Sequence, residues 1–360
     1  SDLDAYANSL GVTCNANDIV SATAFMSTEF NNWAVYGDGT YDLSDDLRLI
    51  FGLRYTDDEV SYTHRRISND EYGRRGVGVR PATENTDAEG VVDETNLSGR
   101  LGVQYDLDQN QMVYATYSQG YKGPGFNVYY NFNPENDGRP IGAEESDAYE
   151  IGYKYASRDL LLNIALFSTD IEGFQANNFD CSDGACITRL TNAGDVTTQG
   201  VEVDFMWNAT DNLTLIGGAA YTKAEIDRFN CPEEAECTDR SGLDVPFSPD
   251  MKYSLSAEYF METEHGFDVY YNASYIYTDE QYSDLPGNTG EFNPHSLLPD
   301  YSMLNASVSF SFKDDAFRVS LIAKNLLDES YATTYSGDNF RYQIPRDADR
   351  YYGVAFKARF

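Results

Sequence analysis

The chain has 360 residues, of which 59 are Asp or Glu and 25 are Lys or Arg, so its formal net charge is -34. This balance argues against nucleic acid as a partner, because binding to phosphates needs clustered Lys and Arg. The 29 Tyr and 20 Phe residues indicate an ordered chain despite the acidity. The longest apolar stretch, residues 160–167, is about half of the roughly 18 residues that a membrane-spanning helix needs.

Alternating apolar and polar residues predict β-strands along the chain. Leu304, Ala306 and Val308, for example, are separated by polar residues, and a period of two means a strand with one apolar face. About thirteen strands are expected. In chain order, the predicted hairpins combine residues 33–41 with 47–64, 94–105 with 112–121, 146–155 with 160–174, 196–207 with 213–227, 248–261 with 267–282 and 304–312 with 317–324, followed by a last strand at 351–360.

The connections between the predicted strands alternate in length. Within hairpins they have roughly four or five residues, and between hairpins roughly fifteen to thirty, rich in Asp, Asn, Gly, Pro and Tyr. An outer-membrane barrel has short turns at one rim and long loops at the other. This alternation therefore favours an all-β, antiparallel transmembrane barrel with short periplasmic turns and long extracellular loops.

Aromatic residues near the predicted strand ends support a barrel. A membrane barrel carries a girdle of aromatic side chains at each interface with water. The alternative is a large soluble β-sandwich with exposed tyrosines. The residues expected in girdles include Trp33, Tyr36, Tyr41, Tyr114, Tyr117, Tyr121, Tyr270, Tyr271, Tyr275 and Tyr277.

Four of the five cysteines form two closely spaced pairs. Cys181 and Cys186 bracket one short acidic segment, and Cys231 and Cys237 bracket another. Because no histidine lies nearby, two short-loop disulfides in an oxidising compartment are favoured over zinc sites. Cys14 is left over, and its partner is expected in a part of the protein beyond this sequence.

The predicted long loops hold the candidate ligand contacts. The loop at residues 122–139 offers Tyr129, Tyr130, Phe132 and Arg139, which could stack on and pair with an anionic or catecholate ligand, or could pack the loop at the membrane interface. The acidic loops allow either Ca²⁺ binding or solvated charge, and their spacing matches no calcium-loop motif. The three histidines are far apart in sequence, so neither a catalytic site nor a metal site is expected.

Several segments together resemble the C-terminal half of the barrel of TonB-dependent receptors. They are NNWAVYGDGTYDLSDDLRLIFGLRYTDDE at 31–59, YATYSQGYKGPGFN at 114–127, TTQGVEVDFMW at 197–207, AKNLLDESYATTY at 323–335 and the terminal Phe360.

The resemblance implies a 22-strand barrel of the outer membrane, of which residues 1–360 would supply about the last thirteen strands. The N-terminal plug domain and the early strands would be absent from this sequence. The expected function is energised import of a scarce bulky nutrient, most often an iron–siderophore complex. The implied partners are the TonB–ExbB–ExbD complex, which would act through the absent N-terminal part, and the lipid and lipopolysaccharide of the outer membrane.

Two alternatives belong to other functional classes. If residues 19–30 form one more strand, a closed barrel of about fourteen strands could act as a passive channel. A soluble or surface-exposed adhesive β-protein is the second alternative. An enzyme is not expected in any of these cases.

Overall fold

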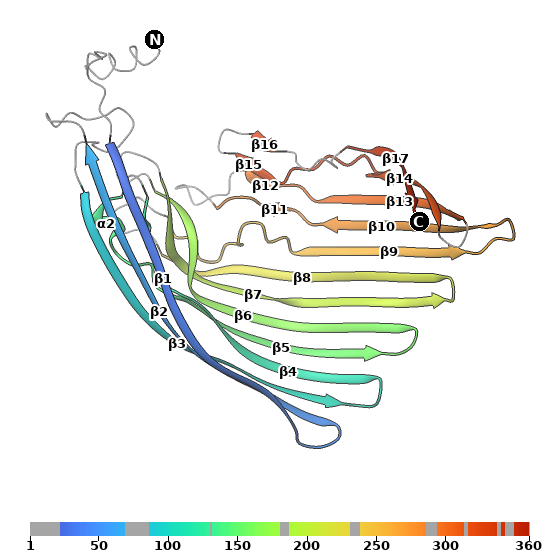
Figure 1. The fold of residues 1–360 in the computed structure, drawn as a ribbon, viewed down its shortest axis with the longest axis horizontal. Helices are drawn as coiled ribbons and strands as arrows, with labels where there is room; N and C mark the ends of the chain where they lie inside the picture. Colours follow the sequence, from blue (N-terminus) through green and yellow to red (C-terminus); the bar gives the residue numbers. More distant parts are fainter. Residues whose placement is uncertain are drawn as a thin grey trace, which may run out of the picture.

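A computed structural model describes residues 22–68, 86–129, 132–180, 187–230, 238–285, 294–312, 316–336, 340–342 and 349–359. Within these ranges, 13 strands form one antiparallel sheet, and each strand pairs with the next one along the chain (Figure 1). The strands of this sheet are β1 (Ala22–Asp42), β2 (Leu47–Ser68), β3 (Thr86–Asp106), β4 (Gln111–Lys122), β5 (Glu144–Ala156), β6 (Leu160–Asp180), β7 (Ile187–Thr210), β8 (Leu213–Phe229), β9 (Met251–Met261), β10 (Phe267–Thr278), β13 (Tyr301–Phe312), β14 (Phe317–Lys324) and β17 (Tyr351–Ala358).

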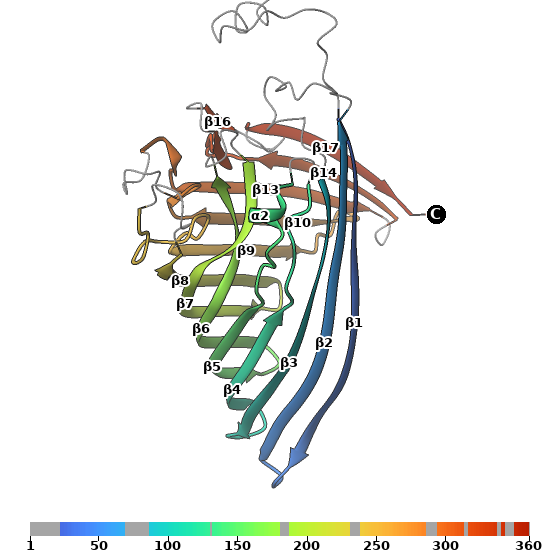
Figure 2. The same cartoon turned by 90° about the vertical axis from the view of Figure 1, so that its left-hand side faces the viewer.

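The main sheet is curved and open. Figures 1 and 2 show it bending into a trough whose two edges are β1 and β17. No helix in the described ranges is long and apolar enough to cross a membrane. The remaining short elements are α2 (Pro134–Asp137), η1 (Pro294–Ser296) and two small sheets that pair β11 (Gln281–Tyr282) with β12 (Leu297–Leu298) and β15 (Thr334–Ser336) with β16 (Phe340–Tyr342).

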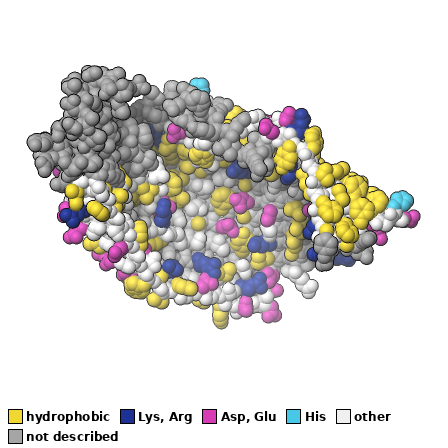
Figure 3. Space-filling view, turned by 45° about the horizontal axis from the view of Figure 1, so that its top comes forward, with side chains coloured by type: hydrophobic (Ala, Val, Ile, Leu, Met, Phe, Trp, Pro, Cys, Tyr) yellow, Lys and Arg dark blue, Asp and Glu magenta, His cyan; other side chains and the backbone are white. Residues whose placement is uncertain are grey.

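The sheet has one apolar face and one polar face. On β3, the exposed Leu97 and Leu101 lie on one face, and Ser98 and Arg100 lie on the other. Because residues directly opposite each other on paired strands share a face, the register carries this division across the sheet. Figure 3 shows charged side chains scattered inside the hollow of the trough, which the polar face lines.

Two rows of aromatic side chains border the apolar face. One row follows the ends of the strands that meet in long loops, and Trp33 packs there on Tyr55 with ring centroids 5.4 Å apart. The other row, which includes the exposed Tyr41, Tyr105 and Trp207, follows the ends that meet in tight turns. From Trp33 to Tyr41, on the same face of β1, the strand rises roughly 26 Å at about 3.3 Å per residue, close to the ~25 Å apolar band of outer-membrane barrels.

Three of the expected girdle residues, Tyr36, Tyr114 and Tyr270, lie on the polar face instead. Tyr36 is paired with Arg54 on β2, whose Cζ lies 5.8 Å from the centroid of its ring. Tyr114 is paired with Gly152 and bonds to Glu150, and Tyr270 lies under Arg318 with 4.3 Å between the ring centroid and Cζ. These three tyrosines lie on the polar face because the strict alternation of a strand outweighs the preference of Tyr for an interface.

The predicted strands and tight turns agree with the observed hairpins, but several strands are longer than expected. The idea of a separate strand over residues 19–30 is wrong, since β1 runs unbroken from Ala22 to Asp42 and its first half pairs with β2 up to Ser68. The polar stretch around Asn31 and Asn32 interrupts the apolar pattern because this part lies beyond the apolar band, where no face needs to be apolar.

The sequence motif at residues 323–335 forms a tight turn. Asn325 is fully buried with φ 48°, and its side chain bonds to both the N–H and the carbonyl of Glu329 at 3.0 and 2.8 Å. Its own N–H donates to the side chain of Asn305 at 3.0 Å. The turn at residues 325–329 therefore ends β14.

Candidate ligand pathway on the polar face

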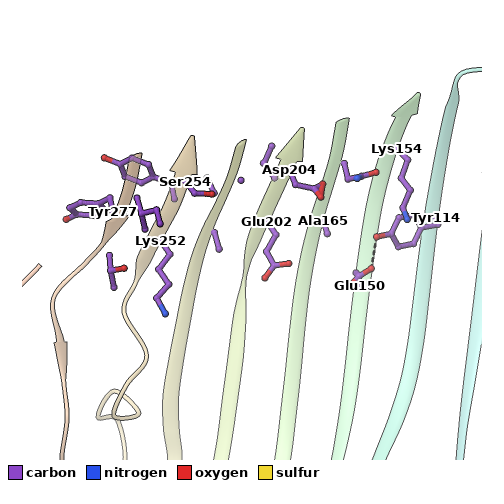
Figure 4. Close-up of a pocket in the computed structure, with 17 residues that line it drawn as sticks. Tyr114, Glu150, Lys154, Ala165, Glu202, Asp204, Lys252, Ser254 and Tyr277 are labelled. Carbon is purple, nitrogen blue, oxygen red and sulfur yellow. Dashed lines mark hydrogen bonds between the residues drawn. The ribbon is translucent and has the colours of Figure 1, made fainter. Parts of the chain in front are cut away.

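A charged wall crosses the polar face from β4 to β10. The hydroxyl of Tyr114 donates to Glu150 at 2.6 Å, and the Lys154 ammonium lies 5.4 Å from the Tyr114 ring centroid (Figure 4). Glu202 on β7 and Lys252 on β9 line the same hollow of about 560 Å³. This wall therefore presents both carboxylates and ammonium groups to the interior of the trough.

The wall from β9 to β14 is richer in small hydroxyl side chains. Its polar face carries many small hydroxyl side chains, such as Ser307 on β13, and Ser309 lies 2.8 Å from Ser320 on the next strand. A hollow of about 310 Å³ lies here, with Glu258 and Lys324 at its border. The lumenal face of the trough is therefore polar along its whole width.

At the long-loop end the wall has a gap. The strands β4 and β5 end at Lys122 and Glu144, whereas β3 and β6 continue beyond them. Residues 123–143, here called the bridging loop, fill this gap and include α2. Figure 2 shows α2 between the upper parts of β3 and β6.

Aromatic packing joins the bridging loop to β2. Phe132 is 1% exposed, and its ring centroid lies 5.1 Å from that of Tyr62 and 4.8 Å from that of His64, on which it stacks. Phe126 adds a contact with Tyr62 at 4.7 Å. Burial, helped by the carboxylate of Asp137, raises the pKa of Tyr62. The cluster is dry and packed.

Side-chain amides join the other side of the bridging loop to β6 and β7. Asn127 donates to the carbonyl of Leu190 at 2.7 Å and accepts from its N–H at 3.0 Å. Gln175 donates to the carbonyls of Gly123 and Gly142 at 3.0 and 2.8 Å. Each amide replaces a backbone partner that a regular sheet would supply, so the loop is anchored on both sides.

The extensions of β6 and β7 bend where both strands contain irregularities. Gly173 (φ 66°) lies in a bulge of β6, and its N–H donates to Asp195 at 3.1 Å. Arg228 at the end of β8 donates to both oxygens of the same carboxylate, at 2.7 and 3.1 Å. These bonds from Arg228 hold the pKa of Asp195 below its usual range.

Three of the four residues predicted from sequence to contact a ligand are described by the structure, and they lie in different environments. Phe132 lies inside the aromatic cluster, Tyr129 accepts the N–H of Phe132 with its carbonyl at 3.1 Å, and Arg139 is exposed. Tyr130 lies outside the described residues. So do Cys14 and all four cysteines of the predicted disulfides, Cys181, Cys186, Cys231 and Cys237.

The side-chain amides that hold the bridging loop in place were not predicted from the sequence. Asn127, Gln175 and Asn192 look like ordinary loop or strand residues, and their partners lie up to 63 positions away in sequence. Among the described residues, no group of three or more His, Cys, Asp or Glu side chains is placed to hold a metal ion.

A family model described as "TonB dependent receptor-like, beta-barrel" matches residues 2–326. The pesticin receptor of Yersinia pestis is 28% identical over 248 residues, which cover 69% of this chain and 32% of that protein. The catecholate siderophore receptor Fiu of Escherichia coli K12 is 25% identical over 328 residues, covering 87% of this chain and 40% of that protein. The chain thus spans less than half the length of these curated relatives.

Solved structures of the same kind share the fold. The ferric yersiniabactin uptake receptor FyuA from Yersinia pestis superimposes with a TM-score of 0.71 at 22% identity, over 95% of this chain and 47% of that one. The closed form of the ferric-catecholate import receptor Fiu from E. coli K12 gives a TM-score of 0.69 at 21% identity, over 93% of this chain and 45% of that one.

Proposed function

The chain belongs to the TonB-dependent receptor-like β-barrel family, and on this basis we propose that the full-length protein is a gated outer-membrane importer of an iron–siderophore complex. The observation that carries the proposal is the division of the sheet. Its apolar face, bordered by two aromatic rows, suits lipid, and its charged face suits a wet lumen. In this orientation the tight turns are periplasmic and the bridging loop is extracellular.

The sheet needs further strands to span a membrane. An open edge in lipid would leave a row of backbone groups without hydrogen bonds. Because all 13 strands are antiparallel in sequence order, β1 and β17 run in the same direction and cannot pair with each other in an antiparallel way. An odd number of additional strands would close the barrel, which agrees with nine more in a 22-strand barrel.

A plug domain inside the lumen would give the charged wall its partner. The carboxylates of Glu150, Glu202 and Asp204 face the lumen, and Tyr114 is the only described residue that bonds to one of them. A globular segment of the same polypeptide with basic side chains would complement them. Energy from the inner membrane, delivered by TonB with ExbB and ExbD, would then move this plug.

The bridging loop is the first candidate for capture of the ligand. Tyr129, Tyr130 and Arg139 would face an approaching anionic chelate, and Phe132 would keep the loop in place. The pairs Cys181–Cys186 and Cys231–Cys237 would close two further extracellular loops as disulfides. The outer leaflet, including lipopolysaccharide, would surround the aromatic row at the extracellular end.

Transport of radioactive iron tests the proposal. Cells without their own ferric receptors would express the full-length protein and receive iron as ferric catecholate, carboxylate or hydroxamate complexes. We expect binding of at least one complex to the cell surface with or without TonB, and accumulation inside only when TonB is present. Accumulation that is independent of TonB would instead indicate a passive channel.

A further inference from the structure

Near the tight turns, one row of side chains on the polar face of the sheet is apolar. Leu161 on β6, Met206 on β7 and Ile216 on β8 lie directly opposite one another in the register, and they are 46%, 40% and 37% exposed. Met206 follows Asp204 by two positions on β7, so it lies on the same face as Asp204 and Glu202. Leu161, Met206 and Ile216 are here called the apolar row.

The apolar row breaks the alternation of three strands at the same height. Residues 160–162 on β6 and 205–207 on β7 are runs of three apolar residues that lie opposite each other, and residues 215–216 on β8 continue them. Each run places apolar side chains on both faces of the sheet. The outer side chains suit lipid, as the alternation of a barrel strand requires, but the inner ones face the lumen, where polar residues are the rule.

Polar rows lie on both sides of the apolar row. Toward the extracellular end, Asn163, Asp204 and Gly218 lie opposite one another and line the hollow of the charged wall. Toward the tight turns, the hydroxyl of Thr214 donates to the side chain of Asn208 at 2.9 Å. At about 3.3 Å per residue, the apolar row lies roughly 7 Å below Asp204. The row is therefore a confined patch at the periplasmic end of the lumen.

The position of the apolar row limits what can cover it. An exposed apolar patch commonly marks a surface that another molecule or segment covers. In a closed barrel, lipid reaches only the outer face, so the cover of this row must lie inside the lumen. A 22-strand transporter barrel has a wide lumen that is filled by a plug. The curated relatives are more than twice as long as the part of them that aligns with this chain, which leaves ample length for such a segment.

We propose that Leu161, Met206 and Ile216 form an apolar docking surface for the plug at the periplasmic end of the lumen. The plug surface that fits this wall carries apolar side chains against the row and basic side chains higher up, against Asp204 and Glu202. Removal of the apolar side chains from water holds the plug against β6 to β8 in the resting state. This proposal rests on the gated import function, and it adds a contact that salt does not screen.

The experiment compares three variants of the full-length receptor. Leu161→Asn/Met206→Gln replaces two apolar side chains with polar ones of similar size, and Met206→Leu keeps the row apolar. Ser256→Asn is the matched control, because Ser256 lies opposite Ile216 on β9, on the same face and at the same height, and is already polar. Hydrogen exchange is measured for the plug and for β6 to β8 in the purified receptor. Entry of a bulky hydrophilic antibiotic is measured in cells without TonB.

We expect the double variant to raise the exchange rates of plug amides roughly 10- to 100-fold, because docking then buries less apolar area. Exchange in β6 to β8 should stay within about twofold of the wild type, because the lumenal face tolerates polar residues. The antibiotic should enter faster through the double variant, and the difference in exchange should persist at high salt. Met206→Leu and Ser256→Asn should each stay within about twofold of the wild type.

Three results would overturn the proposal. The first is unchanged plug exchange and antibiotic entry in the double variant, which would mean that the row does not hold the plug. The second is an equal effect of Ser256→Asn. The third is exchange that rises in β6 to β8 as much as in the plug, which would assign the row to the stability of the barrel wall. Failure of the import function itself appears separately, as absent TonB-dependent uptake by the wild type.

Discussion

The side chain of Asn127 bonds to both backbone groups of Leu190, so a single amide joins the bridging loop to β7 in the way that a neighbouring strand would. With the aromatic cluster on the other side, this bond makes the extracellular ends of β1 to β8 one continuous wall.

Loss of the amide should release the bridging loop from β7. In the full-length receptor, we expect Asn127→Ala to increase hydrogen exchange of backbone amides in residues 123–143 roughly 10- to 30-fold, because two hydrogen bonds of about 1 kcal/mol each are removed. Asn212→Ala, in an exposed tight turn, is the control. Equal protection in both variants would mean that the aromatic cluster and the amide of Gln175 suffice to hold the loop.

Phe132 should influence ligand binding through the position of the loop. Phe132→Ala would leave a cavity between Tyr62 and His64 and cost about 3–5 kcal/mol locally. Phe132→Leu keeps most of the volume, so the Kd for a bound ferric chelate should stay within about threefold of the wild type. A large loss of affinity in the Leu variant, with normal protection of the loop from exchange, would instead indicate direct stacking on the ligand.

Acid should loosen the upper ends of β6 to β8. Because Arg228 lowers the pKa of Asp195 in the folded protein, the carboxylate contributes stability above its unfolded pKa, and this contribution is lost as the pH falls through the lower folded pKa. Exchange protection at Gly173 and Arg228 should therefore persist at neutral pH and decrease below about pH 4. The Asp195→Asn variant should already have low protection at pH 7. Protection that does not change between pH 7 and pH 3 in the wild type would contradict this role.

Substitutions at two neighbouring residues on β13 test which face of the sheet contacts lipid. Val308 lies on the apolar face and Ser307 on the polar face. In lipid bilayers, Val308→Lys should reduce the free energy of unfolding of the full-length protein by about 2–4 kcal/mol, whereas Ser307→Lys should change it by less than about 1 kcal/mol. Similar losses in urea titrations of both variants would mean that the faces are misassigned.

The sequence predicted the strands within the apolar band well, because there each second residue must suit lipid. It predicted less of the extracellular ends, where water reaches both faces and the alternation fades, as at residues 22–32 of β1. The tight turns were predictable from the short length of the segments that connect the two strands of each hairpin. The contacts of Asn127 and Gln175 were not, because they depend on which strands become neighbours and on backbone groups distant in sequence.

The structure of the full-length protein in a lipid nanodisc, determined by cryo-electron microscopy, tests the account most directly. We expect β1 and β17 each to gain an antiparallel neighbour in a closed barrel with an even number of strands. The wall with Glu150, Glu202 and Lys252 should face a folded plug of the same polypeptide. Direct pairing of β1 with β17, or a lumen without a plug, would contradict the account of a gated importer.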